Sequence, residues 1–527
     1  MTARVVMLQG TASSVGKSLL CAGLCRLLRQ DGYRVAPFKA QNMALNSFAT
    51  PDGREIGRAQ AVQAAAAGLA PHVDMNPILL KPEGNARSQV VLLGRPAGSL
   101  SARDYFQRKR DLWPVVTGAL DRLRAQYDVV VIEGAGSPAE VNLRSREIVN
   151  MRVARHAGAP VFLVGDIDRG GVMAALVGTL ELLLPEERAL VRGLIVNRFR
   201  GDIGLFRDGV TMLQERTALP VLGVVPYIPD LRLPDEDSVA LESRPRGRAA
   251  AGTVVDVAVL RLPHVANFDD FAPLEAEPGV GVRYVEDAAD LDWPDVVVVP
   301  GTKTTIDDLR WLRQKRLADR VVGLAASGAI VLGICGGYQM LGRRIRDPLH
   351  VESNETEVAG LGLLPVETSF ERQKTTRQVR GQVRSLPGPL AGAAESPVEA
   401  YEIHMGRTHG AIPDADTAAF HLEDGRLDGC VNAQGTVIGT YLHGLLHNTP
   451  LRRALLEWAA QRKGLSLAHL PAGDAHAETA AEFDRLAAVL RESLDVGRMY
   501  RLIGLEPPHP QTPSPHWGEG GLMKEEA

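Results

Sequence analysis

The chain has 527 residues, of which 45% are hydrophobic and 23% charged, and its formal net charge is −4. At roughly 150 residues per domain this is an ordinary globular protein of two to four domains, and neither wholesale disorder nor binding of nucleic acid through overall charge is expected. No uncharged apolar run approaches the ~20 residues that span a bilayer, the N-terminus lacks a signal-sequence pattern, and four cysteines are too few for a disulfide framework, so a cytoplasmic protein is expected.

The first part of the chain, residues 1–235, alternates short apolar runs with helical patterns. Continuous apolar runs, unlike alternating ones, are typical of strands that are covered on both faces of a parallel sheet. The predicted strands are Val5–Leu8, Val35–Phe38, Val90–Leu93, Val129–Ile132, Val161–Val164, Leu194–Val196 and Val221–Val225.

A second series of the same kind follows a polar stretch. Residues 236–252 lose the periodicity and are predicted to be a linker, and residues 253–463 form the second domain. Its predicted strands are 254–262, Val282–Val285, Val296–Val299, Ile330–Ile334 and 436–442. Residues 464–505 are predicted to be a helical C-terminal segment, and the Pro- and Gly-rich tail 506–527 to be disordered. The predicted fold class is α/β, with two tandem doubly wound domains and mostly parallel sheets.

The segment Gly10–Ser18, GTASSVGKS, lies between a predicted strand and a predicted helix. A loop in that position turns backbone N–H groups and a helix N-terminus toward an anion, which indicates a phosphate-binding loop. Lys17 would reach the outer phosphates of a nucleoside triphosphate, and Ser18 would bind Mg²⁺. Thr11 stands where the usual pattern has glycine.

Further polar residues follow the predicted strands of the same sheet. Glu133 comes at a carboxyl end, where ligands collect in open sheets, and is a candidate Mg²⁺ ligand. Lys39 adds a cation at this edge, and Asn197 could read the base through its amide. Asp166 and Asp168 could contact Mg²⁺ or water, or could cap the local structure.

In the second domain, an apolar strand leads through Gly333–Gly337 into an apolar helix, with Cys335 at the turn. This is the pattern of a nucleophile elbow with cysteine in place of serine. The helix N-terminus would favour the reactive thiolate. The backbone N–H of Gly336 is expected to form half of an oxyanion hole, and the loop beginning at Gly301 the other half.

A cysteine nucleophile needs a base. His443 follows a late predicted strand and is the preferred candidate, and His404 is the competitor. Cys21 and Cys25 lie one helical turn apart in an apolar helix and have no second ligand pair, so they are interpreted as core residues.

These motifs carry a resemblance to known families. Gly-Ile-Cys335-Gly-Gly with the late His443 resembles class I glutamine amidotransferases, and Gly10–Ser18 with Glu133 resembles the dethiobiotin synthetase-like P-loop family, which shares the threonine. The two in this order resemble the cobyrinic and cobyric acid synthases. Five stretches narrow the resemblance to the cobyric acid synthase family: 38–43, 133–143, 164–171, 197–202 and 401–406.

The resemblance implies ATP- and glutamine-dependent amidation of four carboxylates (b, d, e and g) of adenosylcobyrinic acid a,c-diamide, giving adenosylcobyric acid in cobalamin biosynthesis. By position it implies Cys335 as nucleophile and His443 as its base. On the nucleotide side it implies phosphate, metal and adenine contacts by residues Thr11, Gly16, Lys17, Ser18, Lys39, Glu133 and Asn197.

Two positions depart from the families. Triad amidotransferases usually carry Glu two residues after the histidine, where this chain has Leu445, so the group that orients His443 is open. The dethiobiotin synthetase relatives place an Asp metal ligand where this chain has Gln41 and Asn42.

Three other functions would share part of this pattern. The sister a,c-diamide synthase shares both domain types, and a partitioning-type nucleotide switch would need no nucleophile. A relative that amidates a cell-wall precursor usually divides the two halves between chains. Glutamine and a corrinoid are the expected partners, with no nucleic acid and no membrane, while the oligomeric state is open.

Overall fold

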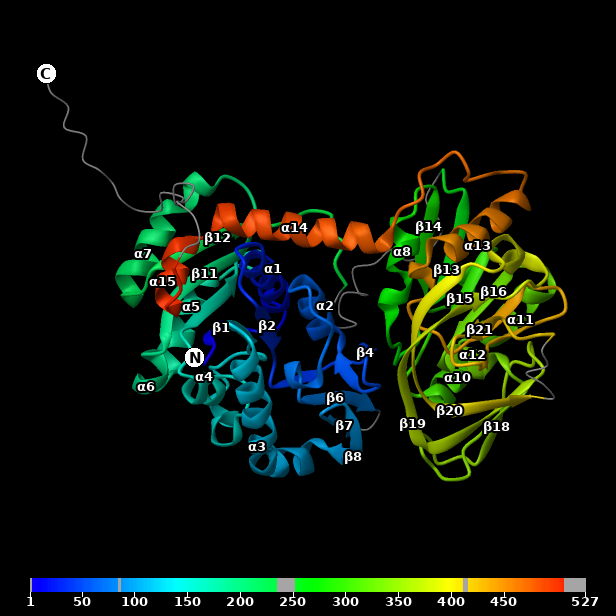
Figure 1. Ribbon diagram of the computed structural model, residues 1–527, viewed down its shortest axis with the longest axis horizontal. Helices are drawn as coiled ribbons and strands as arrows, with labels where there is room; N and C mark the ends of the chain where they lie inside the picture. Colours follow the sequence, from blue (N-terminus) through cyan, green and yellow to red (C-terminus); the bar gives the residue numbers. More distant parts are fainter. Residues whose placement is uncertain (1, 84–86, 235–251, 411–415, 507–527) are drawn as a thin grey trace, which may run out of the picture.

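The computed structural model describes residues 2–83, 87–234, 252–410 and 416–506. Two α/β bodies lie side by side, the first in blue to teal and the second in green to yellow (Figure 1). Within the described residues, no helix is both long enough and apolar enough to cross a membrane. The predicted linker 236–252 lies outside the described residues except for its last position, and the predicted tail does so from residue 507 onward.

The first body is built on a six-stranded parallel sheet in the order β12-β11-β10-β1-β9-β2. Successive residues of its central strand enter different cores: Val5 and Met7 pack on one face, and Val6 and Leu8 on the other. Burial on both faces explains the continuous apolar runs of the sequence. The strands are β1 (Arg4–Gly10), β2 (Val35–Phe38), β9 (Val129–Glu133), β10 (Val161–Asp166), β11 (Val191–Phe199) and β12 (Val221–Pro226).

Helices cover both faces of this sheet. On one face α1 presents its apolar stripe, and on the other face the apolar sides of α3, α4, α5 and α7 pack on the sheet. The helices are α1 (Lys17–Gln30), α2 (Arg58–Ala66), α3 (Ala102–Gln126), α4 (Met151–Ala157), α5 (Val172–Leu182), α6 (Pro185–Arg188) and α7 (Arg207–Thr217), with the 3₁₀ turns η1 (Val73–Met75), η2 (Val141–Arg146) and η3 (Ile203–Phe206).

Between β2 and α3 the chain forms two small sheets beside the second body (Figure 1). The run Val90–Leu93, predicted as a strand of the parallel sheet, belongs to one of them, where it pairs antiparallel with both neighbours. That part of the prediction was wrong because a short apolar run does not reveal its partner. The strands are β3 (Gln41–Met43), β4 (Ser47–Ala49), β5 (Glu55–Gly57), β6 (Ile78–Glu83), β7 (Arg87–Leu92) and β8 (Arg95–Ser101).

The second body has its own six-stranded sheet in the order β14-β13-β15-β16-β24-β23, and all neighbours in it are parallel except β23. The predicted runs Val296–Val299 and Ile330–Ile334 coincide with strands. The two doubly wound bodies confirm the predicted fold class. The strands are β13 (Val255–Leu260), β14 (Val280–Val285), β15 (Val296–Val299), β16 (Ile330–Ile334), β23 (Cys430–Val431) and β24 (Val437–Thr440).

The second body also carries helices, and a mixed, mostly antiparallel sheet that the sequence patterns did not predict. Its long hairpin, β19 with β20, reaches the first body, where Gln378 donates to the carbonyl of Ala49. The sheet contains β17 (Arg344–Arg346), β18 (Glu357–Ala359), β19 (Val366–Val383), β20 (Pro397–Gly410), β21 (Phe420–Leu422) and β22 (Leu427–Asp428). The helices are α8 (Ala272–Ala276), α9 (Ala288–Leu291), α10 (Thr305–Gln314), α11 (Leu317–Ala326), α12 (Gly336–Leu341) and α13 (Thr449–Gln461), with 3₁₀ turns η5 (Phe268–Phe271), η6 (Gly388–Ala393) and η7 (Leu445–His447).

The last two helices return to the first body. The helix α14 (Ala475–Ser493), in orange, runs back to lie against α1, and α15 (Val496–Ile503) follows it (Figure 1). The contact with α1 is close: a Cβ on Gly23 would lie 2.4 Å from Leu490. Leu486, Leu490 and Leu494 complete the apolar core on that face of the sheet. The C-terminal helices therefore belong structurally to the first body.

Candidate active sites

The turn from β16 to α12 holds Cys335 in a strained conformation. Its φ of 52° and ψ of −108° lie where residues other than glycine are rare, as expected of a nucleophile elbow. The turn is tight because α12 begins directly against the neighbouring strand: a Cβ on Gly337 would lie 1.9 Å from the Val299 carbonyl oxygen. Glycine at that position is therefore required by the close approach of two backbones.

His443 reaches Cys335 from the adjacent strand. β16 and β24 are parallel neighbours, and the Cys335 backbone N–H donates to the Thr440 carbonyl at 2.8 Å. The residues that follow the two strands therefore meet at one sheet edge, where Cys335 and His443 line the same cavity. Both side chains are buried, with 7% of Cys335 and 2% of His443 exposed.

Asp270 completes the cluster. Its Oδ2 lies 2.7 Å from His443 Nδ1, and its Oδ1 accepts from the Gly444 backbone N–H at 2.7 Å. The carboxylate lies on η5, in the loop that follows β13, and is 2% exposed. Sequence reasoning missed this residue and left open what orients the histidine. Leu445, which stands in place of the usual Glu, is buried.

The ionisation of His443 follows from these contacts. Burial alone disfavours the imidazolium, but the Asp270 carboxylate and the hydrogen bond with Cys335 outweigh it and raise the pKa of His443 to about 10. At neutral pH the imidazole is therefore protonated beside the cysteine sulfur. A cysteine and a protonated histidine held in this way can supply a nucleophile and a proton donor.

The competing histidine, His404, lies near but is engaged differently. Its Nδ1 lies 2.7 Å from the Gly406 carbonyl oxygen, and its ring stacks on Tyr441 with 3.8 Å between centroids. The nearest carboxylate oxygen, on Glu402, is 3.9 Å from its Nε2. The Cys335 Sγ instead lies 3.4 Å from the Ile403 carbonyl oxygen. These contacts favour His443 as the partner of Cys335.

The two glycines predicted for the oxyanion hole flank the sulfur. Gly336 is the first residue of α12, directly after Cys335. Gly301 lies on the loop after β15, and a Cβ there would lie 2.9 Å from His443 Cε1. The structure thus brings both glycines to the elbow, where backbone N–H groups at a helix start can face a developing oxyanion.

A cavity opens beside Cys335 and His443 and is shared by both bodies. Among its lining residues are Gln339 and Glu352 of the second body and Lys81 of the first. Burial raises the pKa of Glu352 to about 8. Lys81 is itself held by Glu55 at 2.7 Å, and Glu55 also binds Lys374 of the second body. The Cys335–His443–Asp270 cluster therefore faces the first body directly.

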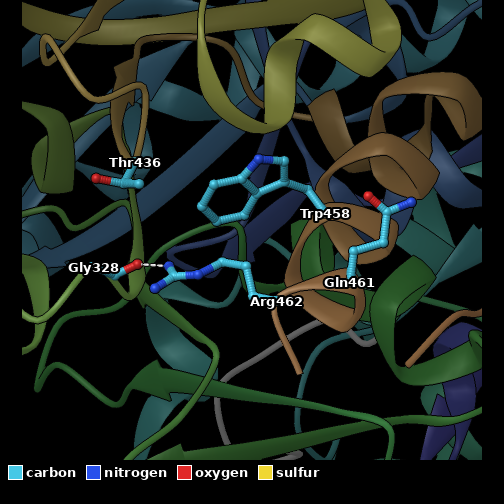
Figure 2. A pocket seen from close by; sticks show the side chains of 5 residues that line it. All are labelled: Gly328, Thr436, Trp458, Gln461 and Arg462. Carbon is cyan, nitrogen blue, oxygen red and sulfur yellow. Dashed lines mark hydrogen bonds between the residues drawn. The ribbon is translucent and has the colours of Figure 1, made fainter. Parts of the chain in front are cut away.

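A second hollow, of about 450 Å³, is lined by Gly328, Thr436, Trp458, Gln461 and Arg462 (Figure 2). Gly328 and Thr436 precede β16 and β24, so this hollow lies at the sheet edge opposite Cys335. Figure 2 shows Arg462 bonded to the Gly328 carbonyl, and the guanidinium lies 5.0 Å from the Trp458 ring centroid. Among the described residues that line it there is no thiol, carboxylate or imidazole.

In the first body, the predicted phosphate loop runs from β1 into α1. Gly16 adopts a φ of 93°, and a Cβ there would lie 2.2 Å from the Asn197 amide nitrogen. The Lys17 ammonium donates to the carbonyls of Ala12 at 2.9 Å and Gly136 at 3.2 Å, and so lies across the loop. A glycine in left-handed conformation followed by lysine at a helix start is the geometry of an anion-binding loop.

Glu133 is the centre of the polar cluster beside this loop. Its Oε1 accepts from the Ser18 hydroxyl and lies 2.8 Å from the Lys39 ammonium. Its Oε2 accepts from the Gln63 amide at 2.6 Å. The structure therefore brings Ser18 of the predicted phosphate loop together with Lys39 and Glu133, which follow neighbouring strands, and adds Gln63, which sequence reasoning missed.

The donor set fits a hard cation at one place. The Ser18 hydroxyl and the Glu133 carboxylate are oxygen donors side by side, and Mg²⁺ is commonly held by one or two protein oxygens together with phosphates. Within the described ranges, no group of three or more His, Cys, Asp or Glu side chains could hold a metal ion. A protein-only metal centre is therefore not indicated in that part of the chain.

The other predicted contacts of this site lie around the loop. Asn197 donates to the Val15 carbonyl at 2.8 Å, so its amide supports the loop. The Thr11 backbone N–H donates to the Val164 carbonyl at 2.9 Å. Asp166 pairs with Arg198 at 2.9 Å and Asp168 with Arg200 at 2.7 Å, which favours structural roles for both aspartates.

Gln41 and Asn42, which stand where the related family has an Asp metal ligand, form hydrogen bonds with other side chains of the first body. Gln41 accepts from the Tyr105 hydroxyl at 2.6 Å, and Asn42 donates to Gln60 at 3.1 Å. Cys21 and Cys25 are fully buried in α1, as expected for core residues.

Comparison with known proteins agrees with this two-site arrangement. Residues 6–240 match the model of the CobQ/CobB/MinD/ParA nucleotide binding domain, and residues 256–451 match that of the CobB/CobQ-like glutamine amidotransferase domain. The chain is 55% identical over 521 residues to a cobyric acid synthase of Sorangium cellulosum, covering 96% of this chain and 100% of that protein. It is 51% identical over 514 residues to one of Moorella thermoacetica, covering 96% and 98%.

Proposed function

The chain belongs to the cobyric acid synthase family of glutamine amidotransferase ligases in cobalamin biosynthesis, and on this premise we propose a reaction and assign its residues. The reaction is the amidation of the b, d, e and g carboxylates of adenosylcobyrinic acid a,c-diamide, with glutamine as nitrogen donor and ATP as energy source. The observation that carries the assignment is the buried Cys335–His443–Asp270 cluster in a chain that also holds a phosphate loop.

We assign glutamine hydrolysis to this cluster. The Cys335 thiolate attacks the amide carbon of glutamine, and the tetrahedral intermediate collapses as His443 gives its proton to the leaving nitrogen, releasing ammonia and leaving a thioester. Water, deprotonated by His443, then cleaves the thioester to glutamate and the thiol. Asp270 is a positioning residue, which holds the imidazole and stabilises its charged form.

The oxyanion of each intermediate is assigned to the backbone N–H groups of Gly336 and of the loop at Gly301. The helix start at Gly336 and the closeness of Gly301 to His443 support this assignment. Such donors stabilise charge as it develops, and removal of a single donor typically costs about 10²–10³ in rate.

We assign carboxylate activation to the first body. ATP would convert a substrate carboxylate to an acyl phosphate, which ammonia can attack because phosphate is a good leaving group. Lys17 would bind the outer phosphates, with Lys39, Thr11, Gly16 and Asn197 shaping the nucleotide site. Ser18 and Glu133 would hold Mg²⁺, which supplies charge neutralisation on the phosphates when bound.

The two reactions need a transfer of ammonia. Ammonium is not nucleophilic, so neutral ammonia must reach the acyl phosphate before it is protonated. The cavity beside Cys335 is lined in part by Lys81 and Gln89 of the first body, which supports a sheltered route between the halves.

This organisation also bears on the domains. We propose residues 1–235 as the ATP and corrinoid domain and 253–463 as the amidotransferase domain. The segment 464–505 then stabilises the ATP and corrinoid domain, because its helices share an apolar core with α1.

Mass spectrometry of the corrinoid product tests the proposal. The a,c-diamide incubated with ATP, Mg²⁺ and glutamine should gain four amides, with glutamate and ADP formed alongside. Conversion of cobyrinic acid itself only to the a,c-diamide, or amidation at another number of positions, would overturn the assignment.

A further inference from the structure

The segment that carries Asp270 is held by the first body. Asn267, the residue before η5, makes two reciprocal hydrogen bonds across the interface: its backbone N–H donates to the Asn46 side chain at 2.7 Å, and its own side chain accepts from the Ser47 backbone N–H at 2.8 Å. All three residues are buried, with at most 2% of any of them exposed. The backbone on which Asp270 sits is therefore fixed by residues of the other half.

Arg58 adds an ion pair to these contacts between the two bodies. Its guanidinium lies 2.8 Å from the carboxylate of Asp269, the neighbour of Asp270, and both side chains are largely buried. The same guanidinium lies 5.0 Å from the ring centroid of Phe48, which packs on Tyr401, and Tyr401 stacks on His443 with 5.3 Å between centroids. Arg58 thus contacts two groups that position His443: the loop of Asp270, and the stack of Phe48 and Tyr401.

Arg58 is also the first residue of α2, and Gln63 lies on the same helix. Gln63 donates to Glu133 at 2.6 Å and to the Ser18 carbonyl at 3.2 Å. Five residues of helix advance about 7.5 Å along the axis. One short, buried helix therefore contacts the phosphate loop through Gln63 and the loop of Asp270 through Arg58.

We propose that α2 couples the two sites, with Arg58 as a positioning residue for the Cys335–His443–Asp270 cluster and Gln63 as the contact that senses the nucleotide site. This inference rests on the proposed function. When ATP and Mg²⁺ engage Ser18 and Glu133, the Gln63 contact changes. A shift in the position of α2 then displaces Asp270 through the ion pair between Arg58 and Asp269. Glutamine hydrolysis is thereby faster when the carboxylate-activating site is occupied.

The test measures glutamine hydrolysis with and without MgATP and the corrinoid in wild type, Arg58→Met, Arg58→Lys and Gln63→Leu. The matched control is Gln378→Ala, which removes another hydrogen bond between the bodies, to Ala49, without touching α2 or residues 267–270. Amidation with ammonium chloride is measured in parallel, because it bypasses Cys335.

We expect Arg58→Met to lower kcat for glutamine hydrolysis at least tenfold with little change in KM, to shift the alkaline limb of its pH profile, and to leave ammonium-dependent amidation within threefold of wild type. Arg58→Lys should recover part of the loss. Gln63→Leu should abolish the stimulation of hydrolysis by MgATP, and Gln378→Ala should retain it.

Unchanged kcat and unchanged stimulation in Arg58→Met would overturn the inference. A parallel loss of both activities that Arg58→Lys does not recover would also overturn it, because it indicates a purely structural role. Wild type without hydrolysis or without amidation from either nitrogen source would instead defeat the proposed function.

Discussion

The Asp270 carboxylate lies 2.7 Å from the His443 imidazole, although the two residues are 173 positions apart in the chain. The contact joins the loop after β13 to a residue in the loop after β24, and it supplies a carboxylate that Leu445 cannot provide. It keeps His443 charged at neutral pH beside Cys335. His443, near the C-terminal end of the second domain's sequence, is thus oriented by a residue near the N-terminal end of that sequence.

Asp270→Asn tests this relationship through the pH profile. Because the Asp270 charge favours the imidazolium against the effect of burial, its removal lowers the pKa of His443 from about 10. The alkaline limb of kcat/KM for glutamine hydrolysis should therefore move to lower pH, and kcat should fall by about 10²-fold or more. An alkaline limb that stays in place would show that Asp270 does not set the state of His443. The exposed Asp307→Asn serves as a control and should leave the limb unmoved.

Lys17→Met should weaken ATP binding at least tenfold, because Lys17 crosses the phosphate loop and would pair with the outer phosphates. Isothermal titration with a non-hydrolysable ATP analogue and Mg²⁺ measures the change. Lys315→Met removes an exposed lysine of the second body and should bind the analogue as wild type does. Equal affinities in all three proteins would exclude Lys17 from the nucleotide site.

Gly337→Ala should unfold at a lower temperature and lose glutamine hydrolysis, since the added Cβ would lie 1.9 Å from the Val299 carbonyl oxygen. Overpacking of this kind typically costs about 1–3 kcal/mol or more. The control is Gly323→Ala in α11, where a Cβ meets nothing within 4 Å and Ala is favoured by about 1 kcal/mol as a helix former. A Gly337→Ala protein as stable and active as wild type would contradict the packing of the elbow.

Asp428 gives the stability of the fold a pH dependence. Burial raises its pKa from 3.8 to about 7, although the Thr440 hydroxyl bonds it. Between these values the unfolded chain releases the proton while the folded protein keeps it, so stability falls as pH rises from about 4 to about 7, by at most about 1.4 kcal/mol per unit. In Asp428→Asn this group cannot ionise, so the variant does not lose this stability as the pH rises.

Urea denaturation of Asp428→Asn and wild type at pH 5, 6 and 7 measures the effect. The free energy of unfolding of the variant, relative to wild type, should increase with pH over this range. A difference independent of pH would show that Asp428 ionises equally in both states.

The parts that the sequence predicted well share one physical cause. Val296–Val299 and Ile330–Ile334 are strands buried on both faces, so their apolar runs are unbroken, and the left-handed φ of 93° before Lys17 requires a glycine at position 16. Local signals of this kind can be read without a partner. The elbow and the phosphate loop were therefore predictable together with their neighbours at the strand ends.

The parts that were missed depend on contacts between distant segments. Asp270 is one of two adjacent aspartates in a loop, and only folding shows which one faces His443 and which one faces Arg58. The hairpin of β19 and β20 has one buried and one exposed face and alternates weakly. Val90–Leu93 was assigned to the wrong sheet because a short apolar run does not reveal which strands it pairs with.

We propose that one chain couples a thiol that releases ammonia to an ATP site that activates carboxylates. Amidation of the corrinoid by Cys335→Ser, compared between glutamine and ammonium chloride as nitrogen donors, tests it most directly. We expect glutamine-dependent amidation to fall by about 10³-fold or more while ammonium-dependent amidation persists. Glutamine-dependent amidation that survives in Cys335→Ser, or loss of both activities in a folded protein, would contradict it.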